Sequence, residues 1–378
     1  MYRIYSGEQI LHHPYADFSE NKTAISAKLA EEVNTHGSLD MVLDDPPNIW
    51  LRSPIEVYDD DGMAWRGRIL SLENGFVDGR KNYHCEGWLA VLCDTIIQPF
   101  SFRGRPGDYT SGGQTVKGLF HHFIDQHNAQ LPANDPRRFT VGIVNVTDPN
   151  NFIYRSSESA MTTWEAIKTR LLDINGGYVY LSGDDLNVIN YVADFDDTSY
   201  PTVHFGENLI DLVNGVSADG LVTMLYAYGA QNDEEHTEPE PGGPDTLQYL
   251  TWNGNRVHLD SPVGYPSAVS KWGVIYGTAT FDDITIAENL VDAAGYWLSQ
   301  NLRDHAESLE ITAADLSLLD PTIEKMGVGR YVSIVCEPLH IDDLLMLCVR
   351  KVTDLLDVSQ TTVTIGRPQN TLTGMVGG

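Results

Sequence analysis

The sequence has few basic residues. Its 378 residues include 24 Lys and Arg against 53 Asp and Glu, a formal net charge of −29. A surface of this charge repels phosphate backbones and anionic membranes unless its few bases are tightly clustered, so we exclude specific nucleic-acid binding. Residues 171–255 contain no Lys or Arg and fifteen Asp or Glu, so the acidity is concentrated in the middle of the chain.

Cysteine is also scarce. The four cysteines, Cys85, Cys93, Cys336 and Cys348, are too few for a disulfide scaffold. Their spacings, with seven residues between the first two and eleven between the last two, match no zinc knuckle. We expect all four to be thiols of the core.

Long apolar runs and an export signal are absent too. A run such as Leu344–Val349 is far below the roughly 18 apolar residues that a membrane-spanning helix needs. The first fourteen residues, MYRIYSGEQILHHP, contain no apolar stretch followed by a small-residue cleavage site, so they do not resemble a secretory signal. The sequence therefore predicts no membrane-spanning segment.

The first ninety residues have the pattern of strands joined by turns. Ile55–Tyr58 and Ala64–Leu70 flank the turn Asp59–Gly62, and Asp-Gly supplies the positive φ that a hairpin turn needs. We predict a hairpin here. The acidic turn lacks the D-x-[DN]-x-[DN]-G spacing and the distal Glu of a calcium loop, which favours a solvated turn.

Between residues 110 and 200 the apolar period changes from two to about 3.6. An apolar stripe predicts one helix, and the capping box Thr162-x-x-Glu165 begins a second, which Gly176-Gly177 ends before a strand at 178–181. The stripe consists of Val116, Leu119, Phe120, Phe123, Ile124 and His127. This region is typical of an α/β insert.

The rest of the chain is β-rich, with one further predicted helix. A capping box, Thr285-x-x-Glu288, begins this helix, predicted over 285–302, and strands are expected around 331–337, 346–351 and 361–365. Residues 231–245, QNDEEHTEPEPGGPD, have no apolar periodicity and predict an exposed acidic loop.

No catalytic, cofactor-binding or metal-binding set can be assembled from the sequence. His36-x-x-x-Asp40 has the spacing of half a zinc peptidase site, but no His-x-His occurs to complete it. HExxH, GxSxG, GxGxxG and GxxxxGK[ST] motifs are also absent, and Gly104, Gly107, Gly112 and Gly113 form no phosphate cradle. We assign no catalytic, cofactor or metal residue.

Weaker candidates have structural explanations. Cys85 lies in a strand-like context and Cys336 precedes Glu337, whereas a nucleophilic thiolate needs an electropositive environment. The adjacent His121 and His122 point in different directions on a helix, so they cannot hold one ion by themselves. A glycosidase pair of carboxylates is a three-dimensional property that sequence neither supports nor excludes.

Several stretches resemble the tail-associated hub family of bacteriophages, whose longer members are called tail-associated lysins or prophage tail endopeptidases. Residues 65–69 (WRGRI) resemble the family's "F-x-G-R-I", and residues 83–95 (YHCEGWLAVLCDT) its "CEG-x-LA-x-L-x-D". Further similar segments follow in the same order, at 153–156 (IYRS), 163–167 (TWEAI), 176–178 (GGY), 205–211 (FGENLID), 272–275 (WGVI), 313–316 (AADL), 328–332 (VGRYV), 338–342 (PLHID) and 361–366 (TTVTIG).

The resemblance implies an α+β, β-rich fold like that of a baseplate hub. It predicts two β-barrel-like domains at 1–97 and 201–366, an α/β insert at 98–200 and a C-terminal tail at 367–378, with the 285–302 helix and the 231–245 loop in the second domain. Three subunits with two similar barrels each would form a pseudo-sixfold ring. Such a ring can bind a hexameric tail protein on one side and trimeric components on the other.

The implied function is structural. The resemblance predicts a homotrimer at the distal end of the virion tail, made in the host cytoplasm. Its expected partners are a hexameric distal tail protein, the tape-measure protein and downstream tail-fibre or receptor-binding components. DNA would pass through without specific binding. The surplus carboxylates either line that channel and repel DNA or coat the outer surface.

We expect no enzymatic activity and no cofactor. In longer relatives a peptidoglycan-cutting or receptor-binding segment follows the hub, whereas here only residues 367–378 follow the last predicted strand. Two alternatives remain open: a cell-wall hydrolase acting through carboxylates, and a carbohydrate-binding receptor module.

Overall fold

The computed structural model describes most of the 378 residues. The described ranges are 2–14, 24–44, 49–74, 80–104, 115–147, 153–195, 200–215, 220–231, 256–281, 284, 287–306, 308–313, 317, 323–339, 341–357 and 361–365. The predicted acidic loop at 231–245 lies outside them except for Gln231, and so does the predicted tail at 367–378.

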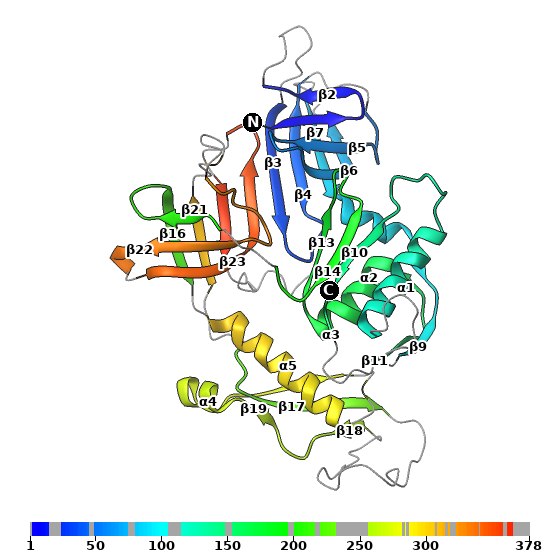
Figure 1. Ribbon diagram of the computed structural model, residues 1–378, viewed down its shortest axis with the longest axis vertical. Coiled ribbons are helices and arrows are strands. Elements are labelled where there is room, and N and C mark those ends of the chain that lie inside the picture. Colours follow the sequence, from blue (N-terminus) through cyan, green and yellow to red (C-terminus); the bar gives the residue numbers. More distant parts are fainter. Residues whose placement is uncertain are drawn as a thin grey trace.

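Strands from the two ends of the chain form one large sheet of thirteen strands (Figure 1). The N-terminal strands are β1 (Arg3–Ser6), β2 (Gln9–His12), β3 (Ala24–Glu32), β4 (Ser38–Leu43), β5 (Pro54–Tyr58), β6 (Met63–Asn74) and β7 (Lys81–Gly87). The C-terminal strands are β15 (Thr202–His204), β16 (Leu209–Gly215), β21 (Ser308–Ala313), β22 (Tyr331–Cys336), β23 (Ile341–Asp354) and β24 (Thr361–Ile365), with a short 3-10 turn at Glu337–Leu339.

One long strand joins the two ends. β23 has fourteen residues, so its first half pairs with β22 while its second half pairs with β24 on one side and β3 on the other. Its Lys351 lies opposite Glu31 of β3, and Leu355 N–H, just after β23, donates to Ala27 O at 2.8 Å. The strand path runs from β16 to β2 without closing in the described part of the chain. The expected pair of separate β-barrels is therefore not confirmed.

The predicted hairpin is confirmed. β5 pairs antiparallel with β6, Val57 lies opposite Trp65, and Gly62 has a φ of 138°. The turn is less solvated than expected, because Asp59 is only 3% exposed. Its Oδ1 accepts hydrogen bonds from the Asp61 and Gly62 N–H groups, and its Oδ2 forms an ion pair with Lys325.

The described middle of the chain folds as helices packed with three small sheets, β10-β14-β13, β11-β9 and β12-β8. The helices are η1 (Trp88–Asp94, 3-10), α1 (Thr115–Ala129), α2 (Thr163–Ile167), a π-helical turn (Lys168–Leu172) and α3 (Asp173–Asn175). The strands are β8 (Ile96–Ile97), β9 (Phe100–Gly104), β10 (Thr140–Val144), β11 (Ile153–Ser157), β12 (Met161–Thr162), β13 (Tyr178–Ser182) and β14 (Val188–Val192). All six residues of the predicted stripe in α1 are buried. Thr162 caps α2 by accepting a hydrogen bond from Glu165 N–H at 3.1 Å, as the capping box predicts.

Between residues 220 and 306, the described strands form a further sheet with its own core, which the sequence did not single out. β17 (Met224–Gln231) pairs with β18 (Arg256–His258), β19 (Val263–Gly264) and β20 (Tyr276–Thr280), and α4 (Pro266–Trp272) follows β19. α5 (Ala287–Ala306) covers one face of this sheet (Figure 1), burying Leu290, Ala294 and Leu298 against Leu225 and Ala227. The helix predicted over 285–302 is thus confirmed, with its described part at 287–306.

Candidate functional site

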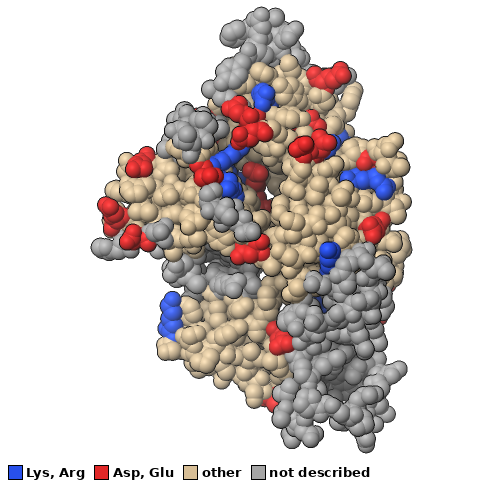
Figure 2. All heavy atoms as spheres, in the orientation of Figure 1, with Lys and Arg blue, Asp and Glu red and all other residues tan. Residues whose placement is uncertain are grey.

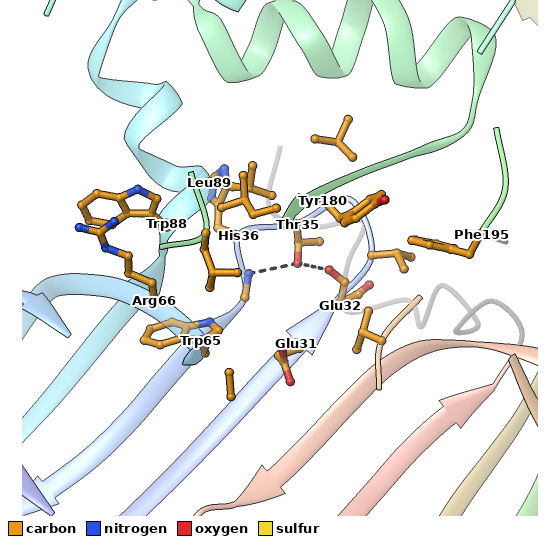
Figure 3. A pocket seen from close by; sticks show the side chains of 17 residues that line it. Glu31, Glu32, Thr35, His36, Trp65, Arg66, Trp88, Leu89, Tyr180 and Phe195 are labelled. Carbon is orange, nitrogen blue, oxygen red and sulfur yellow. Dashed lines mark hydrogen bonds between the residues drawn. The ribbon is translucent and has the colours of Figure 1, made fainter. Parts of the chain in front are cut away.

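A cavity of about 210 Å³ lies where the N-terminal sheet, the middle helices and the C-terminal strands meet. Glu31, Glu32 and His36 line it from the end of β3 and the following turn, and Trp65 and Arg66 from β6. The middle of the chain contributes Trp88, Tyr180 and Phe195 to its walls, and the C-terminal part contributes Val328. Figure 3 shows these side chains arranged around the β3–β4 turn. Figure 2 shows a hollow near the centre of one face, with acidic side chains inside it.

The β3–β4 turn holds the cavity in shape. Asn34 has a φ of 58°, a left-handed conformation that Asn tolerates better than most residues. Its side chain donates to Gly177 O at 2.9 Å and accepts from Val179 N–H at 2.8 Å, which ties the N-terminal sheet to β13. Thr35 Oγ1 donates to Glu32 O at 3.1 Å and accepts from Gly37 N–H at 3.3 Å.

Aromatic rings form two walls of the cavity. Trp65 and Trp88 are each 6% exposed. The Arg66 guanidinium lies 4.0 Å from the centroid of the Trp88 ring and donates to Asp185 O at 3.1 Å, so this ring face already carries a cation. On the other side, the rings of Tyr180 and Phe195 have centroids 5.4 Å apart.

Two carboxylates face this space. Burial raises the pKa of Glu31, an effect that the positive charges of Lys351 and Lys325 partly offset. Lys351 is 3% exposed and its Nζ donates to Met326 O at 2.6 Å. Glu32 is half-buried, and within the described residues its backbone carbonyl, but not its carboxylate, has a hydrogen bond.

Beside the cavity, a network of charged side chains joins β6 to the middle helices. Arg68 is 4% exposed and donates to Glu86 Oε1 at 2.7 Å and to Asp94 at 2.5 and 3.0 Å. Arg52 and Arg137 approach the same Asp94 carboxylate at 2.8 and 3.4 Å. Burial by itself would raise the pKa of Asp94, but the hydrogen bonds and charge of Arg68 outweigh it, so this pKa lies below its ordinary value.

A buried histidine belongs to the packing of the middle helices. His127 of α1 is fully buried, and burial lowers its pKa. Its Nε2 lies 2.9 Å from Arg137 O and its Nδ1 lies 2.6 Å from Thr95 Oγ1. Because a carbonyl only accepts, Nε2 carries the proton and Nδ1 accepts from the threonine hydroxyl. The ring is a satisfied core histidine.

The half zinc motif is not assembled. Asp40 Oδ1 pairs with His84 Nδ1 at 2.6 Å on the exposed side of β4 and β7, whereas His36 packs against Trp164 with centroids 4.8 Å apart and ring planes inclined at 57°. His36 Nε2 lies 3.9 Å from Cys93 Sγ; Cys93 is only partly enclosed by protein, whereas we expected it in the core. Burial, with the charges of Glu86 and Asp94, raises the pKa of Cys93, and burial lowers that of His36. Both groups are therefore neutral near pH 7, which disfavours a thiolate nucleophile.

The other candidates are also structural where they are described. Cys85, Cys336 and Cys348 are buried as expected, and burial raises the pKa of Cys85. His121 and His122 are half-buried on α1, with pKa values lowered by burial.

No three His, Cys, Asp or Glu side chains of the described ranges cluster as metal ligands. No helix in the same ranges is long and apolar enough to cross a membrane. Of the four glycines considered, Gly107, Gly112 and Gly113 lie outside the described residues.

Comparison with known proteins gives matches to structures only. No family model and no curated protein sequence matches the chain. The 43 kDa tail protein of prophage MuSo2 from Shewanella oneidensis matches with a TM-score of 0.64 and 14% identity, over 97% of this chain and 98% of that one. The tail protein from Neisseria meningitidis MC58 matches with a TM-score of 0.65 and 14% identity, over 97% and 96%. The prophage tail protein gp18 from Listeria monocytogenes EGD-e matches with a TM-score of 0.56 and 15% identity, over 99% of this chain and 97% of that one.

The chain has the fold of phage tail proteins. The β-rich α+β fold that the sequence resemblance implied is thereby confirmed, whereas its two β-barrel-like domains are not, and at this level of identity the similarity concerns the fold alone. The cavity was not foreseen, because its residues are spread from position 31 to 328 and form no local pattern. One weak signal preceded it: Trp65, Arg66 and Trp88 lie inside two of the segments that carry the resemblance.

Proposed function

We propose that the chain is a structural protein of a phage tail tip, a homotrimeric hub that closes or continues the distal end of the tail tube. The observation that supports this most strongly is the end-to-end similarity to tail proteins, which covers 97% of this chain and 98% of the Shewanella oneidensis protein. A similarity of that extent spans nearly the whole chain, rather than one widespread module.

The residues of the shared segments have structural roles, which fits a structural function. Arg68 holds the buried ion-pair network, and a Cβ added to Gly67 would lie 2.1 Å from the Trp65 ring. A Cβ on Gly87 would lie 1.7 Å from His36 O, so close backbone packing requires glycine at this position. Trp164 packs on the His36 ring. These residues bind elements of the fold together and form no reacting set.

A trimer would place the N-terminal strands of one subunit beside the C-terminal strands of the next. In a pseudo-sixfold ring the two β-rich parts alternate, so each needs an apolar contact surface. Trp50 and Leu51 in the N-terminal part are 67% and 58% exposed, and Phe205 and Ile210 in the C-terminal part are 51% and 57% exposed. Exposed apolar side chains of this size suit subunit contacts.

The ring would bind a hexameric distal tail protein on one side, with the tape-measure protein in contact at its centre, and trimeric fibre or receptor-binding components on the other. It would thereby adapt sixfold to threefold symmetry. Acidic side chains are scattered over both β-rich parts on the face shown in Figure 2. If such side chains also line the central channel, they repel DNA and let it pass without binding.

Immunogold labelling of phage particles tests the location. An antibody against the purified chain should label the distal end of the tail, one site per particle. A variant in which Trp50 and Phe205 are both changed to Asp should fold, fail to trimerise and leave particles without assembled tails. Label on the capsid, or intact tails built from that variant, would contradict the proposal.

A parallel assay separates the structural role from an enzymatic one. The same purified protein is incubated with labelled peptidoglycan and with host cell walls. The hub requires neither release of soluble fragments nor saturable binding. Release that is lost on substitution of one carboxylate would instead establish a hydrolase, and saturable wall binding would establish a receptor module.

A further inference from the structure

We propose that the cavity beside the β3–β4 turn is a docking site for an arginine side chain on a peptide segment of another tail protein. The proposal rests on the proposed function for the kind of partner, and on the lining of the cavity for its chemistry. The cavity, about 210 Å³, is smaller than a typical small-molecule site and of a size for one long side chain.

Among the described residues, the Glu32 carboxylate has no positively charged partner. The neighbouring carboxylate, Glu31, faces the positive charges of Lys351 and Lys325. Glu32 lines the same cavity, is half-buried, and has no ion pair or hydrogen bond to its carboxylate in the described ranges. A partly desolvated carboxylate without a partner is unfavourable in the free protein and binds an incoming cation strongly.

The walls favour a guanidinium over an ammonium. Figure 3 shows Glu32 between Trp65 on one side and Tyr180 and Phe195 on the other. A planar guanidinium can stack on a ring while donating two parallel hydrogen bonds to a carboxylate, whereas a lysine ammonium cannot do both. The cavity already contains one example of such stacking, since the chain's own Arg66 lies on Trp88.

Two hydrogen-bond donors in the walls of the cavity lack an acceptor among the described residues. Trp88 Nε1–H and Arg66 Nε–H are buried and have no acceptor in the described part of the protein. Both side chains line the cavity. Both donor atoms are enclosed by protein, so a backbone carbonyl next to the docked arginine supplies the missing acceptor only if these side chains turn toward the cavity.

The charge of the whole chain supports the same partner. At −29, it attracts basic segments of other proteins over distances beyond direct contact, which raises the rate of encounter. A single arginine seated in a pocket among aromatic rings is a common form of interface hot spot.

The test is a titration of the full chain with acetyl-Gly-Arg-Gly-amide. Calorimetry measures the binding, and so does tryptophan fluorescence, because Trp65 and Trp88 line the cavity. The matched peptide carries citrulline, which has the shape of arginine without its charge. We expect the arginine peptide to bind at least tenfold more tightly than the citrulline peptide. Glu32→Gln should weaken its binding at least tenfold, whereas Glu8→Gln, an equal charge change in the exposed β1–β2 turn, should not.

Three results would each overturn the proposal: no binding of the arginine peptide at millimolar concentration, equal binding of the citrulline peptide, or unchanged binding to Glu32→Gln. Binding of chitotriose that displaces the peptide would instead identify a sugar site. Light scattering on the same samples reports the subunit number separately. A trimer that fails to bind the peptide refutes only the docking site, and a monomer that binds it refutes only the hub.

Discussion

At the scale of single residues, Arg68 forms the centre of a buried network of charged side chains. Its guanidinium is buried between β6 and η1, where it bonds two carboxylates and the Ala90 carbonyl at 3.1 Å. Burying an arginine is favourable only when such partners surround it, and they in turn become dependent on it. Asp94 and Glu86 are 10% and 18% exposed at the side chain, so neither can be solvated fully if the arginine is removed.

Arg68→Met should therefore lower the free energy of unfolding by about 3 kcal/mol, because it leaves two poorly solvated carboxylates. Urea unfolding followed by fluorescence measures this. The matched control is Arg52→Met, since Arg52 contacts the same Asp94 but is 57% exposed at the side chain. Arg52→Met should lower the free energy of unfolding by less than about 1 kcal/mol. Equal effects of the two variants would contradict a special role for the buried arginine.

The pair of Asp135 and Arg137 predicts a defined pH dependence. Hydrogen bonds from Arg137 lower the pKa of Asp135 from 3.8 to about 2. A carboxyl whose pKa is lower in the folded state stabilises the fold above pH 4, and this contribution is lost as the pH falls toward 2. The parent should thus be more stable than Asp135→Asn at pH 5, with the difference shrinking between pH 4 and pH 2. The control is Asp44→Asn, which removes an exposed carboxylate. If both variants showed the same pH dependence of stability, the stabilising role of the Asp135–Arg137 pair would be refuted.

Two glycines should respond to alanine in opposite directions. Gly295 lies within α5, where an added Cβ meets only Tyr265 Oη at 4.0 Å, so Gly295→Ala should raise stability by up to about 1 kcal/mol. Gly87 lies where an added Cβ would be 1.7 Å from His36 O, so Gly87→Ala should be destabilising by more than about 2 kcal/mol. Thermal unfolding of the two variants checks the signs. A stabilising Gly87→Ala would show that the β3–β4 turn is not packed as described.

At the scale of elements, β23 determines the architecture. Because it pairs with strands of both chain ends, the two β-rich regions share one hydrogen-bonded sheet instead of meeting through side chains alone. Val33 N–H donates to Val349 O at 2.9 Å at one end of the β3–β23 pair, and Leu355 N–H donates to Ala27 O at 2.8 Å at the other. Elements joined in this way open together.

Hydrogen exchange tests this coupling. In moderate denaturant, amides of 27–32 in β3 and 349–354 in β23 should lose protection together, at one denaturant concentration. Amides of 224–228 in β17 belong to a separate sheet and serve as the comparison, since their loss of protection can occur independently. Loss of protection in β3 at a concentration where β23 stays fully protected would mean that the two regions are separate domains.

The elements that could be predicted are those specified by neighbours in sequence. The α1 stripe, the Thr162 cap and the β5–β6 hairpin depend on residues at most a few positions apart, and all are confirmed. Asp59 was expected in solvent because its partner, Lys325, is 266 residues away. The pairing of β3 with β23 and the lining of the cavity are non-local in the same sense, so no periodicity or motif could reveal them.

At the scale of the whole molecule, the acidic charge and the proposed assembly must be compatible. Each subunit carries −29, so three subunits in a ring repel one another unless apolar contacts offset the repulsion. Exposed apolar side chains occur in both β-rich parts, including Trp50 and Phe205. The cavity of Glu32 lies at the junction of the parts, where an arginine from a neighbouring tail protein would join them further.

The most direct test of the hub is electron microscopy of the purified protein in negative stain, with its mass measured by light scattering on the same sample. The account predicts threefold rings with a central hole or plug and a mass of about 126 kDa, three chains of 41.9 kDa each. A compact particle of 41.9 kDa that stays monomeric when a hexameric tail-tip protein is added would contradict the account.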